Sequence, residues 1–268
     1  MLELIDVKAT TLSDAWFQLI YKCVEHGKKF VIDKGSFEGQ TRLEFDYVTI
    51  HITHPDTIPL LPKINPNLSI PDPVSDDYLD GYLPYLMTGE EKEGESYTYG
   101  QRLCKEQTYL ITSNMLGNET HTLDYLDEIV ETTAIVDNNA FHFLNQLDLM
   151  IWTYKNKGYR NNQMCLQVAK PTDMLLQDPP CLRHIDTRIQ DGRLHFFPYF
   201  RSWDLFSGLP ANLAAIELMK QYCADQIGVE NGEIIASSKG LHLYSYVIEL
   251  AESIRGKTIE EFKQEMGE

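Results

Sequence analysis

Hydrophobic and polar positions follow two different periods along this chain, and each period predicts one kind of element. Over residues 12–26 the apolar residues recur at helical spacing, so that Trp16, Leu19 and Cys23 share one face. This pattern predicts an amphipathic helix. Over residues 42–53 apolar and polar residues alternate for part of the length, which predicts a strand.

The rest of the chain continues this succession of strands and helices. Further strands are predicted at residues 29–33, 163–169, 182–189, 193–200 and 232–236. Further helices are predicted at residues 122–131, 139–156, 211–227 and 243–254. Residues 54–75 are proline-rich and without a period, which predicts a surface connection, and residues 78–86 form a short helix or an irregular segment. The order predicts an α+β fold: a single three-layer-like domain over residues 1–268, with one large mixed sheet packed by helices mainly on one face.

The clearest local signal is a hairpin at residues 182–200. The turn Gln190-Asp191-Gly192 separates two strand-like runs, and Asp-Gly in that place favours a tight hairpin. Such a hairpin would return the chain so that Cys181 lies near Arg201. A fixed cation beside a thiol stabilises the thiolate, so this pair is a candidate for nucleophilic chemistry. The structural alternative is a small buried cysteine and an arginine that serves only as an ion-pair partner.

Composition and charge narrow the possible partners. The 268 residues carry a formal net charge of −17, which argues against binding to nucleic acid or to an anionic membrane, although a few arginines suffice for a small anion. No apolar run reaches membrane-spanning length and the first residues lack a signal-peptide pattern, so we expect a cytoplasmic protein. Five scattered cysteines fit a reducing compartment, and no CxxC or HExxH string points to a metal.

Four short strings occur in an order and at intervals that resemble the thymidylate synthase family. They are PPC at residues 179–181, FRSWD at 200–204, GLPAN at 208–212 and HLY at 242–244, with a weaker likeness in YGQR at 99–102. The resemblance implies the thymidylate synthase fold and a homodimer whose large sheets pack back to back. It also implies C5 alkylation of a pyrimidine nucleoside monophosphate, with methylenetetrahydrofolate as the carbon donor.

The resemblance assigns the nucleophile and the phosphate site. Cys181 would add to C6 of the pyrimidine, which turns the ring into an enolate and makes C5 reactive. Arg201 would bind the phosphate and favour the thiolate, because a guanidinium matches phosphate geometry. Ser202 would add a hydroxyl donor to the same phosphate, and Arg160 would reach it across the dimer.

The resemblance also assigns the base, the ribose and the folate. Asn212 would read the base edge, because an amide has both a donor and an acceptor to match O4 and N3–H of uracil. His242 and Tyr244 would hold the ribose 3′-hydroxyl, and Asp204 and Gly208 would face the folate. Each residue also has a structural alternative. Asp204 could brace a turn, Asn212 could be a helix N-cap, and His242 and Tyr244 could be core side chains.

The chain departs from the family pattern at several places. Leu182 follows the nucleophile where the family usually has histidine, and Arg160-Asn161-Asn162 stands where it has two arginines. The family's early proton-relaying acid has only Asp76, Asp77 and Asp80 as candidates, and the C-terminal QEMGE lacks the apolar closing segment. These departures are similar to the archaeal-type branch of the family and to its hydroxymethylase relatives.

The sequence therefore predicts an enzyme that methylates dUMP at C5, with methylenetetrahydrofolate as carbon donor and reductant. The first alternative is a pyrimidine nucleotide hydroxymethylase, acting on dCMP, dUMP or CMP, in which water replaces the hydride. Asn212 argues against a cytosine substrate, because an acid would better suit the cytosine amino group. The second alternative is a non-catalytic dimer that keeps the fold and binds a nucleotide.

Overall fold

A computed structural model describes most of the chain. The described residues are 1–33, 37–91, 93, 97–105, 108–110, 134–136, 139–143, 145–257 and 259–266. The helix predicted at residues 122–131 lies outside them. Within the described ranges, no helix combines the length and the apolar character needed to cross a membrane.

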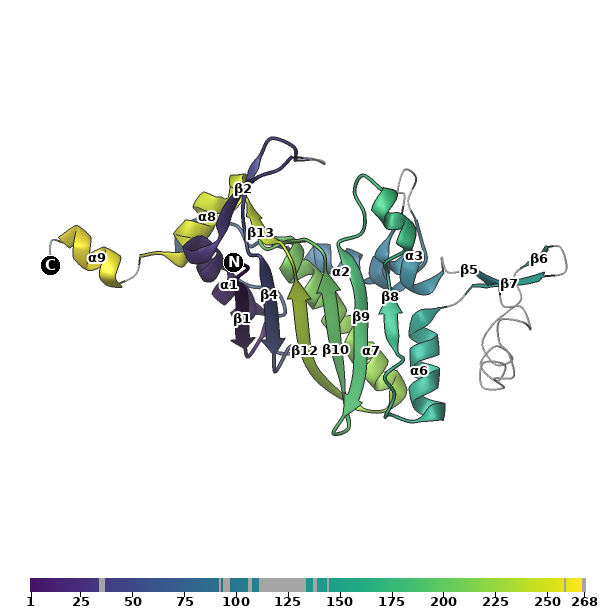
Figure 1. Cartoon of the computed structure of the whole chain (residues 1–268). Coiled ribbons are helices and arrows are strands. Elements are labelled where there is room, and N and C mark those ends of the chain that lie inside the picture. Colours follow the sequence, from purple (N-terminus) through teal and green to yellow (C-terminus); the bar gives the residue numbers. More distant parts are fainter. Residues whose placement is uncertain are drawn as a thin grey trace.

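A six-stranded mixed sheet forms the centre of the molecule (Figure 1). In spatial order its strands are β1 (Leu4–Ala9), β4 (Tyr47–Ile52), β12 (Glu230–Ser238), β10 (Arg193–Phe200), β9 (Leu182–Gln190) and β8 (Cys165–Gln167). The pairs β1–β4 and β12–β10 are parallel, and the other neighbours are antiparallel. The predicted hairpin is therefore confirmed, and it lies inside the largest sheet.

Two smaller sheets accompany the large one. One contains β11 (Trp203–Asp204), β13 (Leu241–Tyr244), β3 (Thr41–Glu44) and β2 (Lys28–Val31) in that order. The other contains β5 (Thr108–Leu110), β7 (Asn139–Phe143) and β6 (Ala134–Val136). The fold is α+β with a large mixed sheet, as predicted, but the strands of the described residues are divided among three sheets rather than gathered in one.

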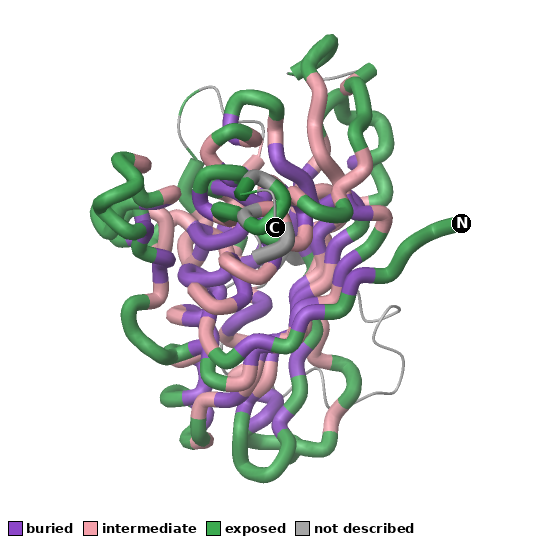
Figure 2. The backbone as a smooth tube through the Cα atoms, turned by 90° about the vertical axis from the view of Figure 1, so that its left-hand side faces the viewer, coloured by how far each residue is buried: buried purple, intermediate pink, exposed green. Residues whose placement is uncertain are grey.

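Helices cover one face of the large sheet. Within the described part of the chain the helices are α1 (Leu12–His26), α2 (Asp76–Met87), α3 (Tyr99–Cys104), α6 (Gln146–Lys157), α7 (Gly208–Ile227), α8 (Ser245–Arg255) and α9 (Ile259–Met266), with 3-10 turns at Pro66–Leu68 and Pro171–Leu175. α1 and α7 contact the sheet directly, and α2 and α6 pack against α7. Figure 2 shows the buried segments gathered in the interior of the molecule.

The alternation of side chains along the strands explains this burial. In β10 the side chains of Leu194, Phe196 and Phe200 are fully buried, whereas their neighbours on the other face are partly exposed. One face of the sheet is thus apolar and packs against α7, as expected for a strand with one covered face. Trp16 of α1 is also buried, and its indole N–H donates to the carbonyls of Leu205 and Phe206 at 3.0 Å. This contact anchors the segment that follows Asp204.

Several predicted boundaries are wrong for local physical reasons. The single strand expected at residues 42–53 is two strands, β3 and β4, which belong to different sheets because the chain leaves one sheet between them. The helix expected from residue 139 begins at Gln146, where Asn145 accepts the N–H groups of Leu147 and Asp148, and residues 139–143 pair as β7. Tertiary pairing here overrides the helical spacing.

Candidate active site

The hairpin brings Cys181 and Arg201 together. Its turn residues Asp191 and Gly192 have φ angles of 52° and 74°, the left-handed pair that a tight two-residue hairpin requires. Phe200 pairs with Leu182 at the open end, and the N–H of Arg201 donates to the carbonyl of Cys181 at 2.8 Å. The predicted proximity of these two residues is confirmed by this direct backbone contact.

The guanidinium of Arg201 is held by the loop that carries the nucleophile. Its Nε donates to the carbonyls of Pro179 and Pro180, each at 3.2 Å. A terminal nitrogen lies 3.2 Å from the carboxylate of Asp178 and also contacts the Pro179 carbonyl. Because these contacts come from consecutive residues, the position of the guanidinium is tied to that of Cys181.

The environment of the Cys181 thiol differs from the predicted one. Burial raises the pKa of this half-buried thiol, and the nearby positive charge of Arg201 opposes that effect without overcoming it. Asp178 raises the pKa of Cys181 further, whereas Arg183 lowers it. Arg201 thus acts in the predicted direction, although desolvation outweighs the neighbouring charges in the structure described.

Two tyrosines that sequence reasoning did not assign lie beside the thiol. The Tyr99 hydroxyl accepts the N–H of Leu182 at 3.3 Å, and the Tyr97 hydroxyl donates to the Asp178 carbonyl at 3.3 Å. Burial, and then the charge of Cys181, raise the pKa of Tyr99, while burial and then Asp178 raise that of Tyr97 to about 12. Both phenols therefore stay protonated near neutral pH. The weak string at residues 99–102 was the available signal.

Arg102 in that string has a structural role. Its side chain is buried, donates to the Val168 carbonyl at 3.1 Å and pairs with Asp173 at 3.0 Å. Asp173 also pairs with Arg183 at 2.9 Å. This ion-pair network joins α3 to the segment before the nucleophile and so stabilises the position of that segment.

Asp204 braces the start of α7. One carboxylate oxygen accepts the N–H of Phe206 at 3.1 Å, and the other accepts those of Ser207 and Gly208 at 3.1 Å and 2.9 Å. An anion at a helix N-terminus is favoured by the helix dipole. The turn-bracing alternative is therefore part of what Asp204 does, and Gly208 is one of its partners.

Asn212 is the fifth residue of α7, just beyond the first turn of this helix, which begins three residues before the predicted start. Pro210 sits within that first turn, where its missing N–H has no cost. The N-cap is Ser207, so the N-cap alternative for Asn212 was wrong. Its amide instead contacts Trp203 at 2.9 Å and Tyr82 at 2.7 Å, and neither contact was predicted.

His242 and Tyr244 lie on β13, next to β11 and β3. The His242 ring is buried, and its Nδ1 lies 2.8 Å from the Gly240 carbonyl. Its Nε2 has no hydrogen-bond partner among the described residues. Burial lowers the pKa of His242 to about 4, so the ring is neutral at pH 7. Burial, followed by the charge of Asp204, raises the pKa of Tyr244 to about 12.

Arg42 approaches the same place from β3. It pairs in register with Tyr244, and its guanidinium forms an ion pair with Glu44 at 2.5 Å. Its charge acts on His242 and on Tyr244. Arg42 is thus near the ribose-binding candidates, although its ion pair is a structural role of its own.

Other predicted site residues are placed differently. Arg160 is exposed, and the segment that joins α6 to β8 runs along the hairpin-turn end of the sheet, in the lower part of Figure 1 and away from Cys181. A single chain therefore does not bring Arg160 to the other residues. Ser202 follows Arg201 directly and is half-buried.

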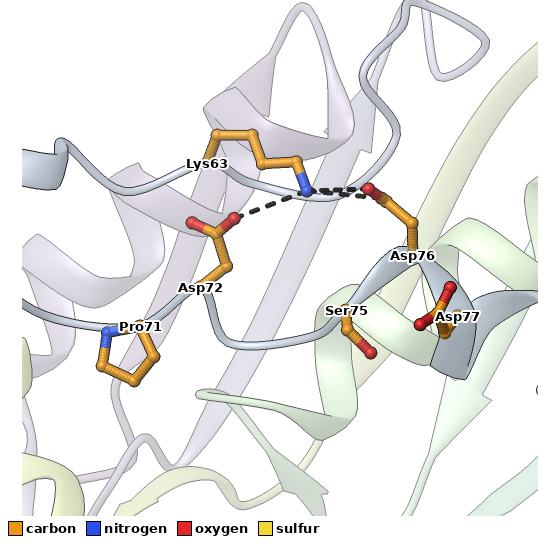
Figure 3. Close-up of a pocket in the computed structure, with 6 residues that line it drawn as sticks. All are labelled: Lys63, Pro71, Asp72, Ser75, Asp76 and Asp77. Carbon is orange, nitrogen blue, oxygen red and sulfur yellow. Dashed lines mark hydrogen bonds and ion pairs between the residues drawn. The ribbon is translucent and has the colours of Figure 1, made fainter.

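The candidate acids at the start of α2 are surface residues. Asp76, Asp77 and Asp80 are all exposed. Lys63 lies 3.2 Å from Asp76 and 3.4 Å from Asp72, and Figure 3 shows both carboxylates directed at its ammonium group. Hydrogen bonding to Asp76 raises the pKa of Lys63. This shallow acidic pocket is an ion-pair cluster, and it offers no buried carboxyl group for a proton relay.

Comparison with known proteins gives the family. The family model for thymidylate synthase matches residues 93–264, which include every string noted above. This chain belongs to the thymidylate synthase family. The match covers most of the chain, so the family extends well beyond the hairpin and its flanks.

Individual relatives of this thymidylate synthase family member are distant. A Methanosarcina barkeri protein named "Putative thymidylate synthase" is 26% identical over 250 residues, covering 92% of this chain and 93% of the relative. A Methanococcoides burtonii protein with the same name is 27% identical, covering 90% and 89% of the two chains. The thymidylate synthase of Listeria monocytogenes is 35% identical over 169 residues, or 60% of this chain and 48% of its own. The archaeal-type resemblance is thus supported across nearly the full length.

Proposed function

We propose that this chain methylates dUMP at C5 to form dTMP, with methylenetetrahydrofolate as carbon donor and reductant and Cys181 as nucleophile. One observation carries the proposal beyond family membership. β11 pairs with β13 so that Asp204 lies opposite His242, and the N–H of Arg201 donates to the carbonyl of Cys181, so backbone contacts link residues from three separate strings of the sequence. This convergence supports a shared pocket for base, ribose and phosphate.

The thiol must lose its proton before it adds to C6, because only the thiolate is a nucleophile. Asp178 works against this step, since it raises the pKa of Cys181 and occupies the guanidinium of Arg201. Its side chain is 73% exposed, so it can move into water when a phosphate arrives. We expect the nucleotide phosphate to replace the Asp178 carboxylate on Arg201, which suits the planar guanidinium.

His242 has the hydrogen-bonding pattern that a ribose hydroxyl needs. In the neutral ring Nδ1–H donates to the Gly240 carbonyl, so Nε2 is an acceptor. A buried acceptor without a partner is costly, and a ribose 3′-hydroxyl would satisfy it. The Tyr244 phenol would remain protonated and able to donate as well as accept.

The reaction then follows covalent catalysis. The Cys181 thiolate forms a bond to C6, the resulting enolate forms a bond from C5 to the methylene carbon of the folate as the bond from that carbon to N10 breaks, and C5 loses its proton. The tetrahydrofolate leaves as the exocyclic methylene forms. Hydride transfer from the tetrahydrofolate then yields the methyl group and dihydrofolate, and the C6–sulfur bond breaks to release Cys181.

The test is product analysis. The purified chain is incubated with methylenetetrahydrofolate and either dUMP or dCMP, and the mass of the nucleotide product is measured by mass spectrometry. A gain of a methyl group on dUMP with formation of dihydrofolate is expected. The Cys181→Ala variant should give no product and no covalent adduct with 5-fluoro-dUMP, while it keeps the wild-type melting temperature.

Other products would redirect the assignment. A hydroxymethyl group with release of tetrahydrofolate would identify a hydroxymethylase, which uses the same thiolate addition. Tight nucleotide binding without product or adduct would identify a non-catalytic nucleotide-binding protein.

A further inference from the structure

The amide of Asn212 has a defined orientation, because one of its partners can only donate. The indole Nε1–H of Trp203 is a donor without acceptor capacity, and it lies 2.9 Å from Oδ1 of Asn212. A flipped amide would place an NH₂ group against this N–H. Trp203 therefore holds the amide with its oxygen toward the indole.

Tyr82 engages the other end of the amide. Nδ2 of Asn212 donates to the Tyr82 hydroxyl at 2.7 Å. Burial raises the pKa of Tyr82 well above its ordinary value, so the phenol is neutral at working pH. After both contacts the amide retains one N–H and one lone pair for a ligand.

Both partners are themselves held in place. Trp203 is 2% exposed, and its ring stacks on Phe200 with centroids 3.8 Å apart and an interplanar angle of 6°. The Tyr82 ring lies in α2 between Tyr78 and Tyr85, with centroid distances of 5.8 Å and 6.1 Å. The amide is thus clamped between the strand that follows Arg201 and a helix far away in sequence.

We infer that Trp203 is a positioning residue that sets the preference of this site for a uracil base over a cytosine base, whereas Tyr82 holds the amide in place without fixing its orientation, because a phenol can both donate and accept. The inference rests on the proposed function, in which Asn212 reads the base edge. Uracil offers N3–H as a donor and O4 as an acceptor, which match the remaining lone pair and N–H of the amide. Cytosine reverses this pattern at both atoms, so a site that accepts it needs the flipped amide that Trp203 prevents.

The experiment measures the dissociation constants of dUMP and dCMP for the full chain and for four variants. Trp203→Phe removes the indole donor, and Tyr82→Phe removes only the hydroxyl. Tyr78→Phe is the matched control, because it removes an exposed hydroxyl from the same helix without touching Asn212. Asn212→Asp tests the base-reading role itself.

We expect the dUMP-to-dCMP preference to fall about tenfold in Trp203→Phe, the value of about one net hydrogen bond, whereas Tyr82→Phe should weaken the binding of both nucleotides equally. Tyr78→Phe should keep the wild-type ratio. Trp203→Met, which also removes the indole donor, replaces Trp203→Phe if that variant does not fold.

Two results would overturn the inference while the proposed function stands. One is an unchanged dUMP-to-dCMP ratio in Trp203→Phe when Asn212→Asp does shift the ratio toward dCMP. The other is an equal weakening of both nucleotides in Trp203→Phe, which would indicate general loosening of the pocket. A wild-type chain that binds neither nucleotide would overturn the proposed function and the inference together.

Discussion

At the residue scale, the reactivity of Cys181 is a balance between burial and three nearby charges. Burial and Asp178 raise the pKa of the thiol, whereas Arg201 and Arg183 lower it. The balance favours the protonated thiol in the structure described. Mutation of these charged residues should therefore change the pKa of Cys181 without altering the nucleophile itself.

Replacing Asp178 with Asn should make Cys181 more reactive. The variant removes a charge that raises the thiol pKa and frees one contact of Arg201, so alkylation of Cys181 by iodoacetamide at pH 7.5 should accelerate several-fold. Arg201→Gln should slow it, because the opposing charge is lost. Rates are read on the Cys181 peptide by mass spectrometry. Equal rates in the wild type and both variants would contradict this electrostatic account.

His242 should make the protein sensitive to acid. Its folded pKa of about 4 lies below the ordinary value of 6.5, so the stability it contributes is present above pH 6.5 and is lost as pH falls through 4. The free energy of unfolding should fall by about 3 kcal/mol over this pH range, because the side chain is deeply buried. Urea titrations between these pH values should show a shallower decline for His242→Asn. His54→Asn, at an exposed position, should follow the wild type.

At the element scale, the hairpin β9–β10 decides the geometry of the site. It joins the nucleophile to the arginine through one backbone hydrogen bond and holds both at an end of the large sheet. Its turn depends on two consecutive left-handed residues, Asp191 and Gly192. A substitution that disfavours this left-handed backbone conformation should therefore destabilise the hairpin.

Two glycine-to-alanine changes should have opposite effects on stability. A Cβ at Gly192 meets nothing within 4 Å, but its φ of 74° is unfavourable for alanine, so Gly192→Ala should cost about 1 kcal/mol. A Cβ at Gly81 also meets nothing, but Gly81 lies inside α2, so Gly81→Ala should stabilise by up to about 1 kcal/mol. Chemical denaturation measures both. Equal signs would show that backbone conformation does not control these positions.

At the scale of the whole molecule, the large sheet has one face without a helix among the described elements. Its side chains include Phe197, Tyr199 and Ile235, which are half-buried in one chain. A sheet with one face uncovered is suited to packing against a second copy, as the family resemblance predicts. The position of Arg160, remote from Cys181 in its own chain, agrees with a contribution across such a dimer.

Subunit mixing tests this arrangement. Cys181→Ala and Arg160→Gln should each be nearly inactive as homodimers. Mixed dimers have one site with both residues intact, so an equal mixture should recover about a quarter of wild-type activity after exchange. The control mixes Cys181→Ala with the Cys181→Ala/Arg160→Gln double variant and should recover none. An active Arg160→Gln homodimer, or no recovery in confirmed mixed dimers, would rule out donation across the interface.

The sequence by itself determined the hairpin, the first helix and the α+β class, because these depend on local turn chemistry and on the period of apolar residues. It also led to the family, since the matched strings keep their order and intervals. The adjacency of Cys181 and Arg201 followed from the hairpin alone, because an Asp-Gly turn sets the register of both strands.

Only the tertiary structure decided how the site is tuned. The division of residues 42–53 between two sheets, the burial that raises the Cys181 pKa, and the clamp on Asn212 all depend on segments distant in sequence. Tyr82 is 130 positions from Asn212, and no local pattern marks that contact. Desolvation and hydrogen bonding act over a few ångströms in space, so they become visible only when the chain is folded.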